Sequence, residues 1–144
     1  MGRFTISVRR LFFGFILLMP DTRTAQISLS EAGVVIVRVR SGARQSMTDA
    51  SENLAMAIAQ AGGRRRPLLV DIRGAQPLAA DVRRQYSGQT VADAFSALAL
   101  LVEGSPFGRM MGNVYFSVAQ LPMPMKMFVE ESQALEWLKG HHAV

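Results

Sequence analysis

The stretch that determines the fold is Pro67-Leu68-Leu69-Val70-Asp71-Ile72-Arg73-Gly74. A short apolar run that opens with proline and closes with a polar turn is typical of a central parallel strand. A helix-like segment that ends at Gly62-Gly63 precedes it, and another begins near Ala79. This order of helix, strand and helix predicts an α/β fold.

Upstream of this strand, the sequence predicts a β-hairpin followed by a helix. Two β-rich runs, residues 27–29 and 34–40, flank a short turn that contains Gly33. A helix is expected from about residue 47 to residue 61. Thr48 or Asp49 can cap it, and Asp49 with Glu52 has capping-box spacing. The hairpin adds an antiparallel pair to the sheet.

Downstream of this strand, helices and strands continue to alternate. We expect a helix over 79–87 with Arg83 pointing outward, a strand over 97–102, and a helix from Ser105-Pro106 to about residue 119. Residues 89–95 fit either an extension of the first helix or a separate turn. A strand over 126–129 and a helix over 130–139 complete the chain. The prediction is a single α/β domain, a mixed sheet of a hairpin plus parallel strands covered by about four helices.

Residues 1–20 differ from the rest of the chain. Arg9-Arg10 precedes an apolar run over 11–18, which is too short to cross a membrane, since a spanning helix needs about 20 residues. The segment is interpreted as a mis-assigned start upstream of Met19, a disordered extension, or a targeting segment such as an export signal or membrane-surface anchor. We therefore place the domain in residues 21–144.

Composition argues against several classes of protein. The net charge is +5, but three arginines lie in the first 18 residues, and the remaining 13 basic and 11 acidic residues are nearly balanced. Arg64-Arg65-Arg66 is interpreted as a solvated turn, because nucleic-acid binding needs a larger basic surface. The absence of cysteine excludes disulfides and a cysteine nucleophile. We expect a cytoplasmic protein with no nucleic-acid partner and no stable membrane span.

Several segments together resemble an uncharacterised bacterial STAS-like family, similar in fold to the anti-sigma-factor antagonists. They are the stretch over 67–74, the Ser105-Pro106 helix start, Pro124-Met125-Lys126-Met127-Phe128 and Ala134-Leu135-Glu136-Trp137-Leu138. The resemblance implies a non-catalytic regulatory or protein-interaction module. The antagonists carry a phosphorylatable serine or threonine in the loop after the central strand, whereas residues 73–81 contain neither. The phosphate switch of those relatives therefore has no acceptor here.

Five residues at the carboxyl ends of the parallel strands are candidate ligand-binding positions, because α/β folds bind ligands there. Asp71 can orient a ligand or pair with a neighbouring arginine, while Ser105 either helps to hold an anion or caps its helix. The same edge carries the remaining candidates, so the set is Asp71, Arg73, Gly74, Ser105 and Arg109.

Repeated glycines and methionines suggest close packing or an interface. Gly104, Gly108 and Gly112 form a stripe that permits close approach to the sheet or to a second subunit. Met123, Met125 and Met127 alternate and so share one face, which with Met110 and Met111 can fill the core or line an adaptable apolar pocket. We predict Trp137 as a core anchor and place His141-His142 in a frayed tail.

Two functions follow from these patterns. No catalytic constellation, metal cluster or cofactor motif can be assembled from the residue pattern, so we expect no enzyme, no metal and no cofactor. The first hypothesis is a regulatory or interaction module that binds a protein partner or forms a homodimer. The alternative is a carrier for a small apolar or anionic ligand at the strand-end edge, which requires a concave pocket of about 300 Å³ or more.

Overall fold

The computed structural model describes residues 21–118 and 121–143. The predictions for residues 1–20, and the predicted helix end near residue 119, lie outside the described residues. The elements are β1 (Ala25–Leu29), β2 (Val35–Val39), α2 (Met47–Ala61), β3 (Arg66–Asp71), α3 (Ala80–Tyr86), α4 (Gln89–Ala94), β4 (Phe95–Leu101), α5 (Pro106–Val118), β5 (Met125–Phe128) and α6 (Glu131–Lys139).

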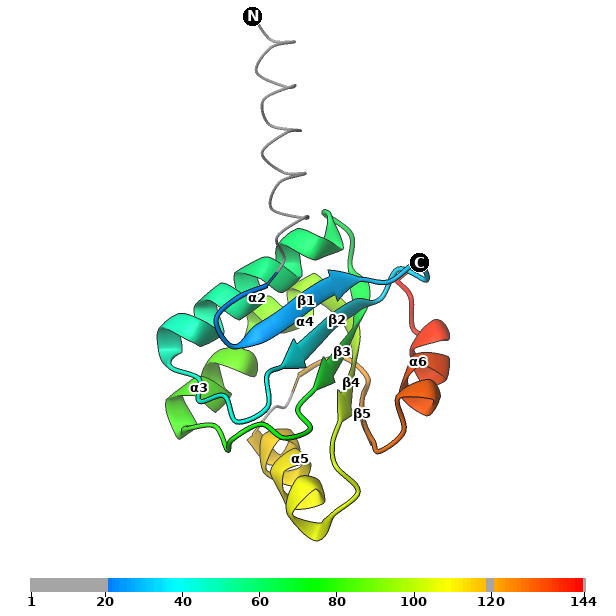
Figure 1. The fold of residues 1–144 in the computed structure, drawn as a ribbon. Helices are drawn as coiled ribbons and strands as arrows, with labels where there is room; N and C mark the ends of the chain where they lie inside the picture. Colours follow the sequence, from blue (N-terminus) through cyan, green and yellow to red (C-terminus); the bar gives the residue numbers. More distant parts are fainter. Residues whose placement is uncertain (1–20, 119–120, 144) are drawn as a thin grey trace, which may run out of the picture.

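The five strands form one mixed sheet in the order β1-β2-β3-β4-β5. The β1–β2 pair is antiparallel, and each following pair is parallel. Figure 1 shows α2, α3 and α4 on one side of the sheet and α6 on the other, with α5 near the end of the sheet. The predicted hairpin, the parallel strands and the α/β class are confirmed.

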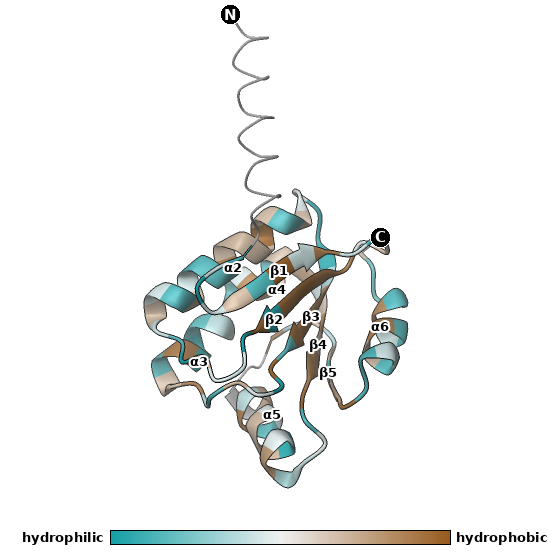
Figure 2. Cartoon of the chain, viewed as in Figure 1, coloured by the Kyte–Doolittle hydropathy of each residue, from teal (hydrophilic) through white to brown (hydrophobic). Residues whose placement is uncertain are grey.

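The two faces of the sheet bury separate hydrophobic clusters. The larger includes Ile27, Val35, Leu54, Phe95 and Leu98, and the alternating methionines Met123, Met125 and Met127 pack against it. The smaller lies under α6 and is made of Val34, Ile36, Leu69, Ala97, Ala99, Leu101, Phe128, Ala134 and Leu138. Figure 2 shows the hydrophobic colour concentrated on the central strands. Burial on both faces explains the continuous apolar runs over 67–70 in β3 and 97–101 in β4.

The start of α2 differs from the prediction. Ser46 is the N-cap, and the capping box joins Ser46 to Asp49 rather than Asp49 to Glu52. The Ser46 hydroxyl accepts from the Asp49 N–H, and the Asp49 carboxylate accepts from the Ser46 N–H. A serine three residues before an aspartate satisfies two backbone donors at once, whereas the predicted caps lie inside the first turn. At the other end Gly62 adopts φ +65°, as expected for a left-handed exit.

The ambiguous segment over 89–95 is a short separate helix, α4. Ser87 ends α3 and Gly88 precedes α4, so the interruption lies at the serine–glycine pair. Phe95 already belongs to β4, where its side chain is fully buried. The strand therefore begins two residues earlier than predicted, because a buried phenylalanine continues the apolar face.

The glycine stripe at Gly104, Gly108 and Gly112 faces its own domain. A Cβ at Gly112 would lie 2.3 Å from Met127 Sδ, and one at Gly108 would lie 2.4 Å from the Glu103 carbonyl oxygen. Both distances are too short for a side chain. Of the two predicted uses, close approach to the sheet is the one observed.

The C-terminal end is packed where fraying was predicted for His141. The ring of His141 packs against Trp137 in a tilted arrangement with centroids 4.2 Å apart, and the backbone N–H of His141 donates to the Leu138 carbonyl. Trp137 also contacts Phe128 at a centroid distance of 5.7 Å. The indole thus links the tail to the smaller cluster, which explains why the helix-ending glycine does not release His141.

Candidate functional site

Asp71 lies in a cluster of four charged side chains at the end of β3. Its carboxylate accepts from Arg73 Nε at 3.0 Å and Arg73 Nη2 at 2.8 Å, and from Arg38 Nη1 at 3.1 Å. Glu131, at the start of α6, accepts from both terminal nitrogens of Arg38 at 2.6 and 3.1 Å. Two arginines and two carboxylates balance each other, so this arrangement joins β2, β3 and α6.

The cluster keeps both carboxylates ionised. Burial alone would raise the pKa of Asp71, but hydrogen bonds and charge from Arg73 and Arg38 outweigh it, so the pKa lies below its usual value. The pKa of Glu131 is also lowered, chiefly by its hydrogen bonds with Arg38. Carboxylates with lowered pKa values that are already hydrogen-bonded to arginine are poor general bases, so this geometry favours the pairing role considered for Asp71.

The other predicted site residues lie in separate local structures. Gly74 adopts φ +76°, and its carbonyl accepts from the Gly42 N–H at 2.8 Å. The hydroxyl of Ser105 accepts from the Gly108 N–H at 3.0 Å, so Ser105 caps α5, while Arg109 is exposed. The structure groups Asp71 with Arg73 and places Ser105 and Arg109 outside that cluster. Ligand binding by these five residues stays a prediction.

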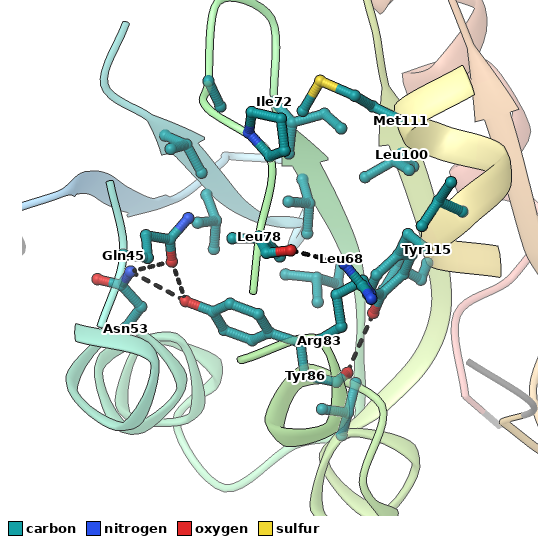
Figure 3. A pocket seen from close by; sticks show the side chains of 18 of the residues that line it. Gln45, Asn53, Leu68, Ile72, Leu78, Arg83, Tyr86, Leu100, Met111 and Tyr115 are labelled. Carbon is teal, nitrogen blue, oxygen red and sulfur yellow. Dashed lines mark hydrogen bonds between the residues drawn. The ribbon is translucent and has the colours of Figure 1, made fainter. Parts of the chain in front are cut away.

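A concave space of about 170 Å³, which we call the apolar hollow, lies between the sheet face that carries the larger cluster and the helices α2, α3, α4 and α5. Its wall combines strand residues, helix residues and the loop that follows β3 (Figure 3). Aliphatic, aromatic and methionine side chains make up most of it: Val37, Val39, Leu54, Ala57, Leu68, Val70, Ile72, Pro77, Leu78, Val91, Phe95, Leu98, Leu100, Phe107, Met110, Met111, Val114 and Tyr115.

Polar groups line one side of the apolar hollow. Asn53 Nδ2 donates to Tyr86 Oη at 3.1 Å and to Gln45 Oε1 at 3.2 Å, and the Tyr86 hydroxyl itself donates to Gln45. Tyr115 donates to the Tyr86 carbonyl at 3.0 Å. Burial raises the pKa of Tyr86 to about 12, and burial also raises the pKa of Tyr115. Both phenols therefore remain protonated and act as hydrogen-bonding groups.

Arg83 also lines the apolar hollow, although the sequence predicted that it points outward. Its Nη1 donates to the Leu78 carbonyl at 2.6 Å. Figure 3 shows the side chain extending from α3 toward Leu78 and Tyr115. The position of an arginine on a helix does not by itself determine where its guanidinium lies. The long aliphatic stem can follow an apolar surface and carry the charged end away from the direction in which the Cβ points.

A second concave space of about 200 Å³, the edge hollow, lies at the strand-end edge where the sequence predicted a ligand site. Gly74 and Glu103 line it, and neither Ser105 nor Arg109 is among its described lining residues. The volumes of both hollows are below the roughly 300 Å³ expected of a pocket for a drug-sized ligand, so either hollow suits only a smaller molecule. The two hollows adjoin, because both are lined by Ile72, Ala75, Gln76, Pro77, Phe107 and Met111.

The fold is shared with a protein of known structure. A crystal structure of an uncharacterized protein of the DUF3478 family, from Shewanella loihica PV-4, is described as having a SpoIIAA-like fold. The TM-score is 0.57 at 18% identity, and the match covers 79% of this chain and 91% of that one. The chain thus has a SpoIIAA-like, STAS-like α/β fold, as the resemblance implied.

The family follows from a second comparison. Residues 27–142 match the family described as Domain of unknown function (DUF7793), and the chain belongs to that family. A protein with unknown function from Arthrobacter sp. FB24 is 27% identical over 82% of this chain and 94% of its own, with a TM-score of 0.31. No curated protein matches the chain.

Two further findings concern membrane-spanning helices and metal-binding groups. Within residues 21–118 and 121–143, no helix has the length and apolar character needed to cross a membrane. In the same part of the chain, no group of three or more histidine, aspartate or glutamate side chains is placed to hold a metal ion.

Proposed function

We propose that this domain is a non-catalytic binding module that holds a small apolar ligand in the apolar hollow. The observation that carries the proposal is a concave space of about 170 Å³ with a wall made chiefly of apolar side chains. An engineered cavity of about 150 Å³ with a similar wall binds benzene, so the volume suits a ligand of that order. Binding of a small ligand was the alternative function predicted from the sequence. The sequence placed the ligand at the strand-end edge, whereas the proposed site lies beneath α5.

The chemistry of the wall favours binding over catalysis. Tyr86 and Tyr115 are held protonated, and their hydrogen bonds are made within the protein. A nucleophile needs an adjacent base, and no aspartate, glutamate or histidine is among the described lining residues. A ligand in this wall would meet hydrogen-bonding and dispersion contacts without a reactive group beside them.

The loop after β3 is the reason to propose a regulatory role for ligand binding in the apolar hollow. In the antagonists that this chain resembles, the corresponding loop carries the phosphorylated residue; here residues 73–81 have no serine or threonine. Ala75, Gln76, Pro77 and Leu78 of this loop instead line the apolar hollow. We propose that ligand occupancy replaces phosphorylation as the input of a regulatory module, which works in the cytoplasm.

Exposed apolar residues of α5 favour a second function, self-association. Phe107, Met110 and Val114, which also line the apolar hollow, are 51%, 52% and 41% exposed and recur on one face of the helix. Two copies can bring identical apolar faces together around a twofold axis, which makes such a contact self-complementary. Sedimentation of the protein and of Met110→Glu tests this: a dimer lost in the variant supports it, and a monomer at all concentrations contradicts it.

The binding function is tested with 1-octanol as an apolar probe. Titration calorimetry should show saturable binding to the protein and loss of binding in Ala57→Leu, whose larger side chain occupies the hollow. Ala55→Leu is the matched control, because Ala55 is an exposed residue on the same helix. Absence of binding to the protein itself would contradict the proposal, as would equal binding to both variants.

A further inference from the structure

Arg83 is the charged residue in the wall of the apolar hollow. Among the described residues that line it, no carboxylate is present to balance the guanidinium. Nor does Arg83 form an ion pair elsewhere in the described chain, in contrast to Arg23, Arg38, Arg40 and Arg73. A cation in a largely apolar wall is costly unless an anion lies close to it.

One edge of this guanidinium has spare hydrogen-bonding capacity. Nη1 donates to the Leu78 carbonyl, whereas the buried Nε–H has no partner within the described residues. The other buried side-chain atoms without partners are Gln60 Nε2 and Ser96 Oγ, and neither residue lines the hollow. A buried donor without an acceptor is uncommon in folded proteins, and here it coincides with the unbalanced charge.

We infer that the apolar hollow takes a small apolar carboxylic acid, bound as its carboxylate with Arg83 as the recognition group. This inference rests on the proposed binding function and specifies its ligand class. A carboxylate presents two oxygens that match two N–H donors of a guanidinium in one plane. One negative charge neutralises the one positive charge in the wall, whereas a phosphate dianion would leave an excess charge in apolar surroundings. The volume fits an alkyl or aryl body of about six to ten carbon atoms.

The remainder of the wall agrees with such a ligand. The aliphatic side chains of the sheet contact the apolar body, and the methionines Met110 and Met111 adapt to its shape. Hydrogen bonds already occupy the side chains of Asn53 and Tyr86, and among the described lining residues the Nε–H of Arg83 is the buried donor without a partner.

The test compares octanoate with 1-octanol, which have chains of equal length and differ in charge. Titration calorimetry near neutral pH should give octanoate at least about tenfold tighter binding than 1-octanol, as expected for a charge-assisted hydrogen bond. Arg83→Met keeps the apolar stem and removes the donors, so the preference should disappear while 1-octanol still binds. Arg83→Lys keeps the charge without the planar pair of donors and should retain a reduced preference. Arg84→Met is the matched control, because Arg84 is the next residue of α3 and is exposed.

The outcomes distinguish a failure of this inference from a failure of the proposed binding function. Equal affinity for the two probes, or a preference for octanoate that survives Arg83→Met, overturns the role of Arg83 and leaves the binding function in place. If neither probe binds the protein, the binding function fails as well. A circular dichroism melt of each variant shows whether it folds, and Arg83→Lys decides the result if Arg83→Met does not fold.

Discussion

Filling the apolar hollow should stabilise the protein in the absence of ligand. Ala57 lies on α2, is 3% exposed and lines the hollow. Leucine has three more carbon atoms than alanine, and each buried carbon contributes about 0.8 kcal/mol. Ordering the longer side chain costs about 0.5–1 kcal/mol. The expected net gain is therefore about 1.5 kcal/mol for Ala57→Leu.

Chemical denaturation measures this change directly. An increase in unfolding free energy of about 1.5 kcal/mol corresponds to a rise of roughly 5 °C in melting temperature for a domain of this size. Ala55→Leu, exposed on the same helix, should stay within about 0.5 kcal/mol of the parent protein. If neighbouring side chains already occupied this space, overpacking would instead destabilise Ala57→Leu by about 1–3 kcal/mol. That result would refute the presence of an open hollow beside α2.

Three further predictions concern the charge cluster and the α5 cap. Asp71→Asn should lower the unfolding free energy by about 2 kcal/mol, less than for a fully buried pair because the arginines are partly exposed, while 1-octanol binding is retained. Because the pKa values of Asp71 and Glu131 are lowered in the folded state, the stability that these carboxylates contribute is present above about pH 4 and is lost as pH falls through the folded pKa values. Denaturation at about pH 7 and pH 3 should therefore show that acid lowers the unfolding free energy of Asp71→Asn by less than that of the parent protein. Ser105→Ala should cost about 1 kcal/mol by thermal unfolding without changing probe affinity, and a selective loss of affinity would show that Ser105 contacts the ligand.

Local features could be predicted from the sequence because neighbouring residues determine them. The apolar run ending at Asp71 predicted β3, and the short spacing between Asp71 and Arg73 made their pairing foreseeable. The cap at Ser105 follows from the serine–proline pair that begins α5. In each case the interacting groups are separated by three residues or fewer.

The remaining site could not be predicted because it joins distant segments. Arg38 and Glu131 lie 93 residues apart in sequence, and only the sheet order brings both to Asp71. The apolar hollow is formed by strands, four helices and the loop after β3, so no single periodicity reveals it. A useful signal was available in α3, where Arg84 has Asp81 three residues before it, whereas Arg83 has no acidic residue three or four residues away on the helix. One of them, Arg83, turned inward.

Methyl NMR during titration with 1-octanol tests the central claim most directly. The account predicts saturable chemical-shift changes for the methyl groups of Leu100 and Met111, which line the apolar hollow, and little change for Ala134 and Leu138 beneath α6. Saturable changes centred on Ala134 and Leu138, or no saturable change in Leu100 and Met111, would contradict ligand binding in the apolar hollow.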